Sequence, residues 1–404
     1  MIESSPLKHL ASVRIVNGVG EAAEFDNPEW PRYVRTTDIA SPRLLRTDTF
    51  KSLPPEIASR APLEDGDIVM TAAGATIGKS LLYSSPKPAC YAGYLVRFRP
   101  KHGVDSRFIA YWMESQHYWD QISTGKVVST IENFSAGKYQ NLRCPSPPPS
   151  AQRAIADYLD TETARIDALI EKKQRMTEVF ESRTESVIST VLDPLINHWG
   201  ETPLKYVSEI RFSNVDKKSH DGQSVVKLCN YTDVYYNRRI TGDLDFMTAT
   251  ATVEQIRRFS LCAGDVLFTK DSETADDIAV PALVIADLPG VVLGYHLAML
   301  RPTGVNGDFL YWVLRSRRCR DAFSLAASGV TRVGLRQDSV GRVPIPSASL
   351  NDQVKVVEQL ENTTRVLDEV SSTLESQIAL LRERRQALIT TAVTGELKVP
   401  GVAA

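Results

Sequence analysis

The chain has 404 residues, of which 43% are hydrophobic and 24% are charged, and its formal net charge is −2 at pH 7. This length and composition predict two or three domains with hydrophobic cores and exclude a wholly disordered chain. So small a net charge excludes a coat protein that neutralises DNA phosphates along a whole face, while local basic patches are compatible with it.

Membrane and disulfide-rich classes are not expected either. No run of about 18 apolar residues occurs, and the sequence begins without the charged, apolar and small-residue order of a secretory leader. We therefore expect a cytoplasmic protein with no membrane segment. The five cysteines are scattered without a CxxC pair, which argues against a zinc knuckle and a disulfide framework.

The first 149 residues contain short apolar runs with β-branched residues, such as Ile68–Met70, which alternate with turns rich in glycine and proline. One helical stretch is expected near residues 108–115. This pattern is typical of a mixed α/β domain, which we predict to span residues 1–149.

A long helix is predicted to follow a proline-rich segment that ends at residue 149. Proline does not fit the interior of a helix or of a central strand, whereas Ser150 is a favourable N-cap. The Asp193-Pro194 pair predicts the end of this helix. We therefore expect the first long helix to cover residues 150–193.

The chain then restarts. The segment TPLKYVSEIRF at residues 202–212 repeats SPLKHLASVRI at residues 5–15, and DGDIVMT returns as AGDVLFT. Later matches, including Trp112 with Trp312, follow in the same order at a nearly constant offset of about 200 residues. The sequence therefore predicts two copies of one unit, with a second globular domain at residues 194–348.

A second long helix is predicted over residues 349–397, followed by a tail at 398–404. Ser349 is its expected N-cap, with Asp352 near a capping-box position. Leucines recur every seven residues along this helix, which indicates a coiled-coil stripe. Since helices of this length rarely stand alone, we expect the two long helices to pair with each other. The alternative is that they only brace a two-domain protein.

The residues expected to form the helix seam share a heptad spacing. Those of the second helix are supported by Val356 and Val370, and those of the first by Val187, Leu169 and Met176, although Lys173 interrupts that stripe. The residues predicted to pair the two helices are Leu159, Ile166, Phe180, Leu360, Leu367, Leu374, Leu381 and Leu388.

Small, hydroxyl-bearing and basic residues gather on expected loops. The segment TAAGATIGKS at residues 71–80 has its glycines one residue too close for a phosphate-binding P-loop, so it either approaches a nucleic-acid backbone or forms a tight turn. The segments TGKVVSTIEN and SGVTRVGLRQDS occupy equivalent places in the two copies. Arginine can bind guanine through two hydrogen bonds, and serine or threonine can hold phosphates. A solvated loop is the alternative for each segment.

Searches for catalytic chemistry find no support. The sequence holds no G-x-S-x-G elbow, no GxGxxG after a strand, no amino-methyltransferase motif and no PD…(D/E)xK nuclease pair. The six histidines show no spacing typical of metal ligands. We therefore expect neither a catalytic residue nor a metal site on this chain.

Both copies end in the same way, with a P-x-P segment, a glutamine (Gln152 or Gln353) and a long helix that carries TARIDALIEKKQ or LLRERRQALITTAVTGEL. In this respect the whole chain resembles the specificity subunit of a type I restriction-modification system. The resemblance implies an α+β protein with a pseudo-two-fold internal repeat, in which two target-recognition domains are separated by two long antiparallel coiled-coil helices.

The resemblance also implies the partners. Each domain would read one half of a bipartite site on double-stranded DNA, and the helices would dock two methyltransferase subunits and, indirectly, restriction or motor subunits. No cofactor is expected on this chain, since S-adenosylmethionine, ATP and Mg²⁺ would bind to the partner subunits. Because the loops of the two copies differ, the DNA site is expected to be asymmetric.

The residues expected to contact DNA are a choice of loop positions, because the resemblance identifies none of them individually. Two alternative functions stay open: a coiled-coil interaction scaffold without a DNA role, and a stand-alone DNA-modifying enzyme. The predicted DNA-binding residues are Arg35, Thr37, Lys79, Lys126 and Ser129 in the first copy, and Lys270, Arg332 and Arg336 in the second.

Overall fold

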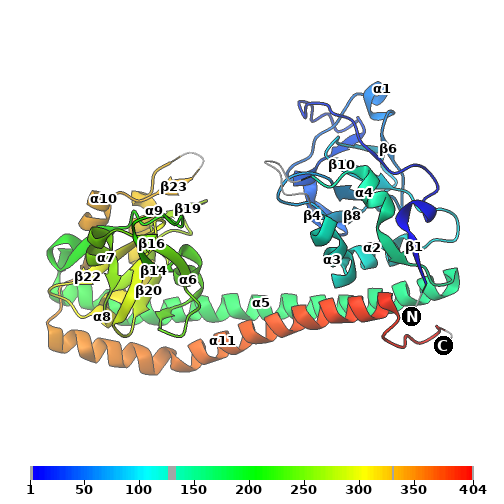
Figure 1. The fold of residues 1–404 in the computed structure, drawn as a ribbon. Coiled ribbons are helices and arrows are strands. Elements are labelled where there is room, and N and C mark those ends of the chain that lie inside the picture. Colours follow the sequence, from blue (N-terminus) through cyan, green and yellow to red (C-terminus); the bar gives the residue numbers. More distant parts are fainter. Residues whose placement is uncertain (1–2, 126–132, 330–331, 403–404) are drawn as a thin grey trace. The chain divides into compact units, whose positions relative to one another are not determined.

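The computed structural model describes residues 3–125, 133–329 and 332–402. The chain forms two compact units, of which unit 1 comprises Met1–Gln174 with Glu375–Ala404 and unit 2 comprises Arg175–Leu374. Each unit holds one α/β domain and one stretch of each of two long helices, α5 (Pro149–Trp199) and α11 (Leu350–Thr394) (Figure 1). The predicted mixed α/β class with an internal repeat is confirmed.

The domain of unit 1 is built on an antiparallel sheet with β2 (Val16–Asn17), β10 (Leu95–Phe98), β7 (Ile68–Thr71) and β8 (Ser80–Leu82), in that order. Every residue of β7 is buried, which accounts for its continuous apolar run. The other strands are β3 (Arg32–Val34), β9 (Ala89–Tyr91) and β6 (Pro62–Leu63) in a second sheet, and the pairs β1 (Ser4–Pro6) with β11 (Arg143–Pro145) and β4 (Ile39–Ser41) with β5 (Leu44–Leu45).

Short helices pack against both sheets of this domain. The predicted helix near residues 108–115 is present as α2 (Ser106–Glu114), whose N-cap Asp105 accepts hydrogen bonds from the backbone N–H groups of Arg107 and Phe108. Seven of its nine residues are buried. The remaining helices are α1 (Pro55–Ala58), α3 (Gln116–Gly125) and α4 (Ala136–Asn141), with 3-10 turns η1 (Leu7–His9) and η2 (Thr36–Asp38).

The domain of unit 2 repeats this plan with additions. Its main sheet has the order β13 (Ser208–Phe212), β22 (Leu297–Pro302), β18 (Val266–Thr269), β20 (Pro281–Val284) and β15 (Arg239–Ile240). The other strands are β16 (Met247–Ala251), β14 (Ser224–Cys229), β21 (Leu288–Leu293) and β17 (Ser260–Leu261) in a second sheet, and the pairs β12 (Glu201–Pro203) with β24 (Pro344–Pro346) and β19 (Asp271–Ser272) with β23 (Val333–Gly334). The helices are η3 (Leu204–Tyr206), α6 (Tyr231–Tyr236), α7 (Val253–Phe259), α8 (Gly307–Arg315), α9 (Arg317–Ala326) and α10 (Gln337–Arg342).

A buried ion pair marks the same place in both sheets. In unit 1 the guanidinium of Arg99 lies 2.7 Å from the carboxylate of Asp67, and in unit 2 that of Arg301 lies 2.6 Å from Asp265. Both aspartates are buried. The DGD and AGD segments of the sequence repeat therefore return as one structural feature.

The match of Trp112 with Trp312 is wrong by one residue. Ser115 Oγ donates to the carbonyl of Trp112, and Ser316 Oγ donates to the carbonyl of Val313, each at 2.6 Å. These serines follow α2 and α8 directly and fix their register, so Trp112 is equivalent to Val313. The sequence match paired the two tryptophans because both are buried residues of equivalent helices, although they occupy positions one residue apart.

The predicted end of the first long helix is also wrong. Helix α5 continues through Pro194 to Trp199. Leu192 is buried in the core of unit 2, and Leu195 and Trp199 pack against that core, so burial offsets the backbone hydrogen bond that proline cannot donate. Helix α11 ends at Thr394, three residues before the predicted end at residue 397, and at its start the backbone N–H of Asp352 donates to Ser349 Oγ.

The two long helices run in opposite directions within each unit. In unit 1, Asp167 lies 2.9 Å from Arg385, while Leu159, nearer the start of α5, shares a core with Ile389, nearer the end of α11. In unit 2, Ile188 shares a core with Leu360. The predicted antiparallel pairing is therefore present in both units. In the described ranges, no helix is long and apolar enough to cross a membrane.

The residues predicted to form the helix seam differ in how far they are buried. Leu159, Ile166, Leu360 and Leu374 are buried, whereas Phe180, Leu367, Leu381 and Leu388 are half-buried. Leu169 and Met176 are exposed, so the support that they were expected to give to the seam is absent. The positions between the heptad residues are filled by buried hydroxyl side chains, namely Thr163, Thr184, Thr364 and Ser371.

Candidate nucleic-acid interface

The TAAGATIGKS segment of unit 1 is a tight turn between β7 and β8. Gly74 and Gly78 have positive φ angles of 85° and 90°, and a Cβ atom at Gly78 would lie 2.7 Å from the ring of Trp119. Tyr139 Oη accepts a hydrogen bond from the backbone N–H of Gly78 and donates one to the carbonyl of Thr71. The two glycines are therefore required by the turn itself.

The basic residues predicted in unit 1 have partners inside the protein. The Lys79 ammonium donates to the carbonyl of Ile39 at 2.6 Å. The Arg35 guanidinium lies 2.7 Å from the buried carboxylate of Asp38 and also donates to the carbonyl of Thr49. Thr37 is exposed. The two remaining predicted residues, Lys126 and Ser129, lie outside the described residues.

In unit 2 the structure brings Lys270 and Arg332 to one place. Lys270 directly follows β18, and its backbone carbonyl accepts from the N–H of Leu335 at 2.9 Å, which ties it to the loop that carries Arg332. The Lys270 ammonium donates to the carbonyl of Ser213 and lies 4.3 Å from the centre of the Tyr295 ring. Burial lowers the pKa of Lys270. The third predicted residue of this unit, Arg336, is exposed just before α10.

Asp271 and His296, which were not predicted from the sequence, complete this group. Arg332 Nη2 lies 2.7 Å from Asp271 Oδ1, and His296 Nδ1 lies 2.9 Å from Asp271 Oδ2. We refer to Lys270, Asp271, His296 and Arg332 as the Asp271 cluster. Since the turn before β22 supplies His296 and the loop before β23 supplies Arg332, sequence spacing gave no signal of the cluster.

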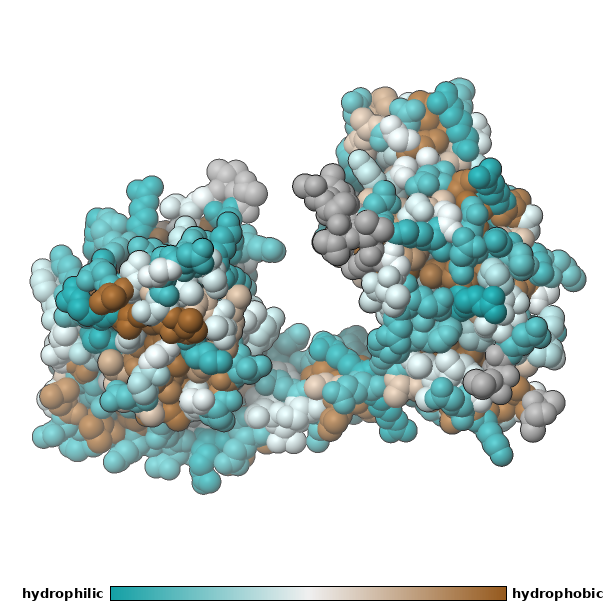
Figure 2. Space-filling view, in the orientation of Figure 1, coloured by the Kyte–Doolittle hydropathy of each residue, from teal (hydrophilic) through white to brown (hydrophobic). Residues whose placement is uncertain are grey.

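Aromatic residues lie near the Asp271 cluster. Tyr231, Tyr295 and His296 line a small cavity of about 60 Å³. The rings of Tyr231 and Tyr235 are stacked with their centres 5.4 Å apart, and Tyr236 beside them is exposed. Figure 2 shows that hydrophilic residues cover much of the visible face of each domain, with separate hydrophobic patches. A cationic group beside exposed aromatic rings is a composition suited to nucleic acid.

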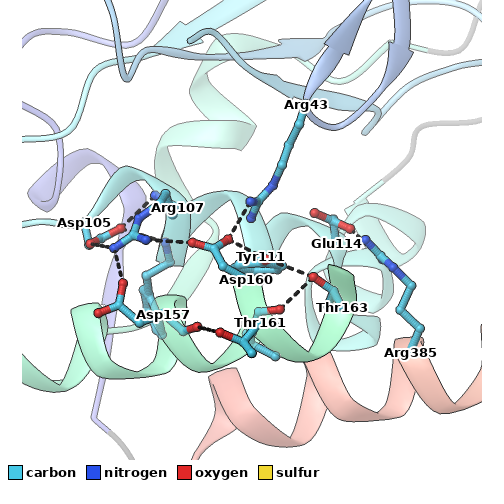
Figure 3. A network of polar contacts seen from close by, with 12 residues as sticks. Arg43, Asp105, Arg107, Tyr111, Glu114, Asp157, Asp160, Thr161, Thr163 and Arg385 are labelled. Atoms are coloured by element: carbon cyan, nitrogen blue, oxygen red, sulfur yellow. Dashed lines mark hydrogen bonds and ion pairs between the residues drawn. The ribbon is translucent and has the colours of Figure 1, made fainter. Parts of the chain in front are cut away.

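In unit 1, a polar network fixes the domain to the long helix α5. Arg43, Arg107 and Tyr111 converge on Asp160 of α5, with distances of 2.7, 2.6 and 2.7 Å to its carboxylate oxygens (Figure 3). Burial raises the pKa of Asp160, but the hydrogen bonds from Arg43 and Tyr111 outweigh this and lower it below its usual range. The network is structural, because its charges are paired with one another.

The same junction includes Arg385 of α11. Its guanidinium lies 2.9 Å from the carboxylate of Glu114 at the end of α2 (Figure 3) and 2.9 Å from that of Asp167 on α5. Glu114 is buried. One arginine therefore ties the domain of unit 1 to both long helices.

Two tandem α/β domains, each joined to its own stretch of an antiparallel helical pair, define the structural class. Residues 44–178 match the family model described as Type I restriction modification DNA specificity domain. The chain is 19% identical over 399 residues to the type I restriction enzyme EcoKI specificity subunit of Escherichia coli strain K12, a match that covers 93% of this chain and 84% of that protein. The StySPI specificity subunit of Salmonella potsdam is 19% identical over 396 residues, with the same two shares covered.

The fold agrees with these matches. A chain from a solved structure concerned with complex assembly and conformational transition of the type I R-M system aligns over 98% of both chains, with a TM-score of 0.61 and 15% sequence identity. The chain is therefore similar to type I restriction-modification specificity subunits in sequence and in fold.

Proposed function

We propose that this chain reads DNA for a type I restriction-modification complex, with each α/β domain binding one half of a bipartite and asymmetric site. The observation that carries this proposal is the internal repeat. The four strands of the unit 1 main sheet match the first four of the unit 2 main sheet, yet the equivalent turns after β7 and β18 carry different side chains. A common scaffold with unequal surface residues suits two different base sequences.

The long helices are the proposed docking surface for two methyltransferase subunits. Both helices expose large apolar side chains to water, among them Val179 on α5 and Leu380 on α11. Exposed apolar groups that leave the helix seam intact are a common feature of surfaces that bind another protein. Restriction or motor subunits would join the complex through the methyltransferase subunits.

The chemistry is proposed to belong to those partners. The methyltransferase subunits would bind S-adenosylmethionine, and a motor subunit would bind ATP and Mg²⁺, so this chain alone would neither methylate nor cleave DNA. The complex would act in the cytoplasm, where the chromosome of a bacterial host lies.

The direct test is to sequence methylated bases in a host with and without this gene. We expect one bipartite asymmetric motif to be methylated only when the gene is present together with its methyltransferase partner. Purified chain alone should incorporate no labelled methyl group. Methyl transfer by the isolated chain would contradict the proposal, and so would a complex that shows no salt-dependent DNA binding, which would favour a scaffold without a DNA role.

A further inference from the structure

Backbone hydrogen bonds make three positions of the two units equivalent. In unit 1 the N–H of Ala72 donates to the carbonyl of Tyr94 at 2.8 Å, and in unit 2 the N–H of Lys270 donates to the carbonyl of His296 at 3.2 Å. Ala73 forms a bridge with Asn133, as Asp271 does with Gly334. The same scaffold therefore carries two alanines and a tyrosine in unit 1, and the lysine, aspartate and histidine of the Asp271 cluster in unit 2.

The Asp271 cluster is arranged so that a carboxylate holds an exposed arginine. The Asp271 side chain is only 17% exposed and contacts Arg332 at 2.7 Å, whereas the Arg332 side chain is 54% exposed. His296 contacts the same carboxylate from the turn before β22, which limits the freedom of Asp271 to turn away. Since an arginine has five N–H donors, the contact through Nη2 leaves the guanidinium able to bind a further acceptor.

The fold does not account for this arrangement. An ion pair with one partner more than half exposed adds about 0–1 kcal/mol to stability, so the cluster is not needed to hold the domain together. Lys270 is different, because its ammonium is partly desolvated between Phe212 and Tyr295 and bonds to the carbonyl of Ser213. Lys270 therefore supports the aromatic surface, and Arg332 is the cation that remains available to a ligand.

We infer that Arg332, positioned by Asp271 and His296, reads a guanine through the major groove of the half-site bound by unit 2. This inference rests on the function proposed above. An arginine that a carboxylate already orients loses less conformational freedom on binding, and its two parallel N–H groups match the O6 and N7 acceptors of guanine. A phosphate contact would need charge but no such orientation. The equivalent strand and turn positions of unit 1, Ala72, Ala73 and Tyr94, supply no charged group.

The test uses the whole complex with its methyltransferase subunits and a library of DNA sites randomised at each position. Arg332→Ala should lower methylation of the preferred site by about 5- to 150-fold, the range of one bidentate contact, and should make one guanine position of one half-site degenerate. Arg332→Lys keeps the charge but not the paired donors, so it should restore little of this preference. Asp271→Asn should relax the same position to a smaller extent.

The matched control is Arg342→Ala, which removes an exposed arginine of unit 2 that pairs with Asp338 at 2.7 Å. It should leave the motif and the methylation rate unchanged. An Arg332→Ala complex with an unchanged motif would overturn the inference, and so would uniform loss that Arg332→Lys restores, because that would mark a phosphate contact. If the wild-type complex methylated no DNA, the function proposed above would fail instead, so the two failures are distinguishable.

Discussion

At the scale of single residues, carboxylates shared between arginines join each domain to a long helix. Asp160 of α5 contacts Arg43 and Arg107 in unit 1, and Asp368 of α11 contacts Arg238 in unit 2. Arg315 lies 4.0 Å from the same Asp368. A carboxylate that two guanidinium groups approach keeps its charge compensated in a partly dehydrated junction. The orientation of each domain on its helix stretch thus depends on a few ion pairs as well as on the hydrophobic core.

We predict that Arg385→Ala destabilises unit 1. The change leaves Glu114, whose side chain is 8% exposed, without the cation that compensates its charge. Breaking a buried pair in this way costs roughly 3–5 kcal/mol, and the partial exposure of Arg385 places the expected loss near the lower value. Denaturant unfolding of the full chain measures it. Adding Glu114→Gln to the variant should recover part of the loss, whereas Arg257→Ala, at an exposed ion pair, should cost less than about 1 kcal/mol.

A pH dependence is predicted for Asp160. Its pKa in the folded protein is lowered from the usual 3.8, so the unfolded state binds the proton more readily. The stability that this carboxylate contributes is therefore fully present above pH 3.8 and is lost as the pH falls through the lower, folded-state value. The difference in unfolding free energy between wild type and Asp160→Asn should be largest near neutral pH and should shrink below about pH 4. The surface variant Asp321→Asn should follow the wild-type curve, and a difference for Asp160→Asn that is independent of pH would contradict the prediction.

At the scale of elements, the paired helices alternate leucine with small hydroxyl residues. Buried Thr163 and Thr364 donate to the carbonyls of Leu159 and Leu360, four residues earlier, at 2.6 and 2.9 Å. Their hydroxyl groups are thereby satisfied without a partner on the other helix. Small residues at these positions let the helices approach closely, while the leucines supply the apolar area.

We predict a large difference between two leucines of α11. Leu360 is fully buried in the core of unit 2, so Leu360→Ala should lower the unfolding free energy by about 2–5 kcal/mol through lost burial and a new cavity. Leu380 is 63% exposed, so Leu380→Ala should change stability by less than about 0.5 kcal/mol. Equal effects of the two substitutions on the denaturation midpoint would show that the seam is not the stabilising surface. If Leu380 belongs to a docking surface, its variant should instead weaken binding of a methyltransferase subunit.

At the scale of the whole molecule, the repeat and the long helices could be predicted because they depend on patterns within continuous segments. The heptad leucines identified α11, whose last residue, Thr394, comes directly before Gly395. The continuation of α5 past Pro194 could not be predicted, since it depends on burial of Leu192 and Trp199 against a domain formed elsewhere in the chain. The Asp271 cluster was missed for the same reason, because turns bring together residues 271, 296 and 332, which no local spacing connects.

The last prediction concerns the division of labour between the two domains. Among the described residues, each hydrophobic core is built within a single unit, so one domain can be exchanged without repacking the other. Replacing residues 1–149 with the same segment of another specificity subunit should change one half of the methylated motif and leave the other half intact. Base-resolution sequencing of methylated DNA from cells that carry the hybrid measures this. The reciprocal replacement of residues 201–348 is the control and should change only the other half. A hybrid that altered both halves of the motif would show that the two domains share base reading. A hybrid that altered neither half would show that the bases are read outside the two domains.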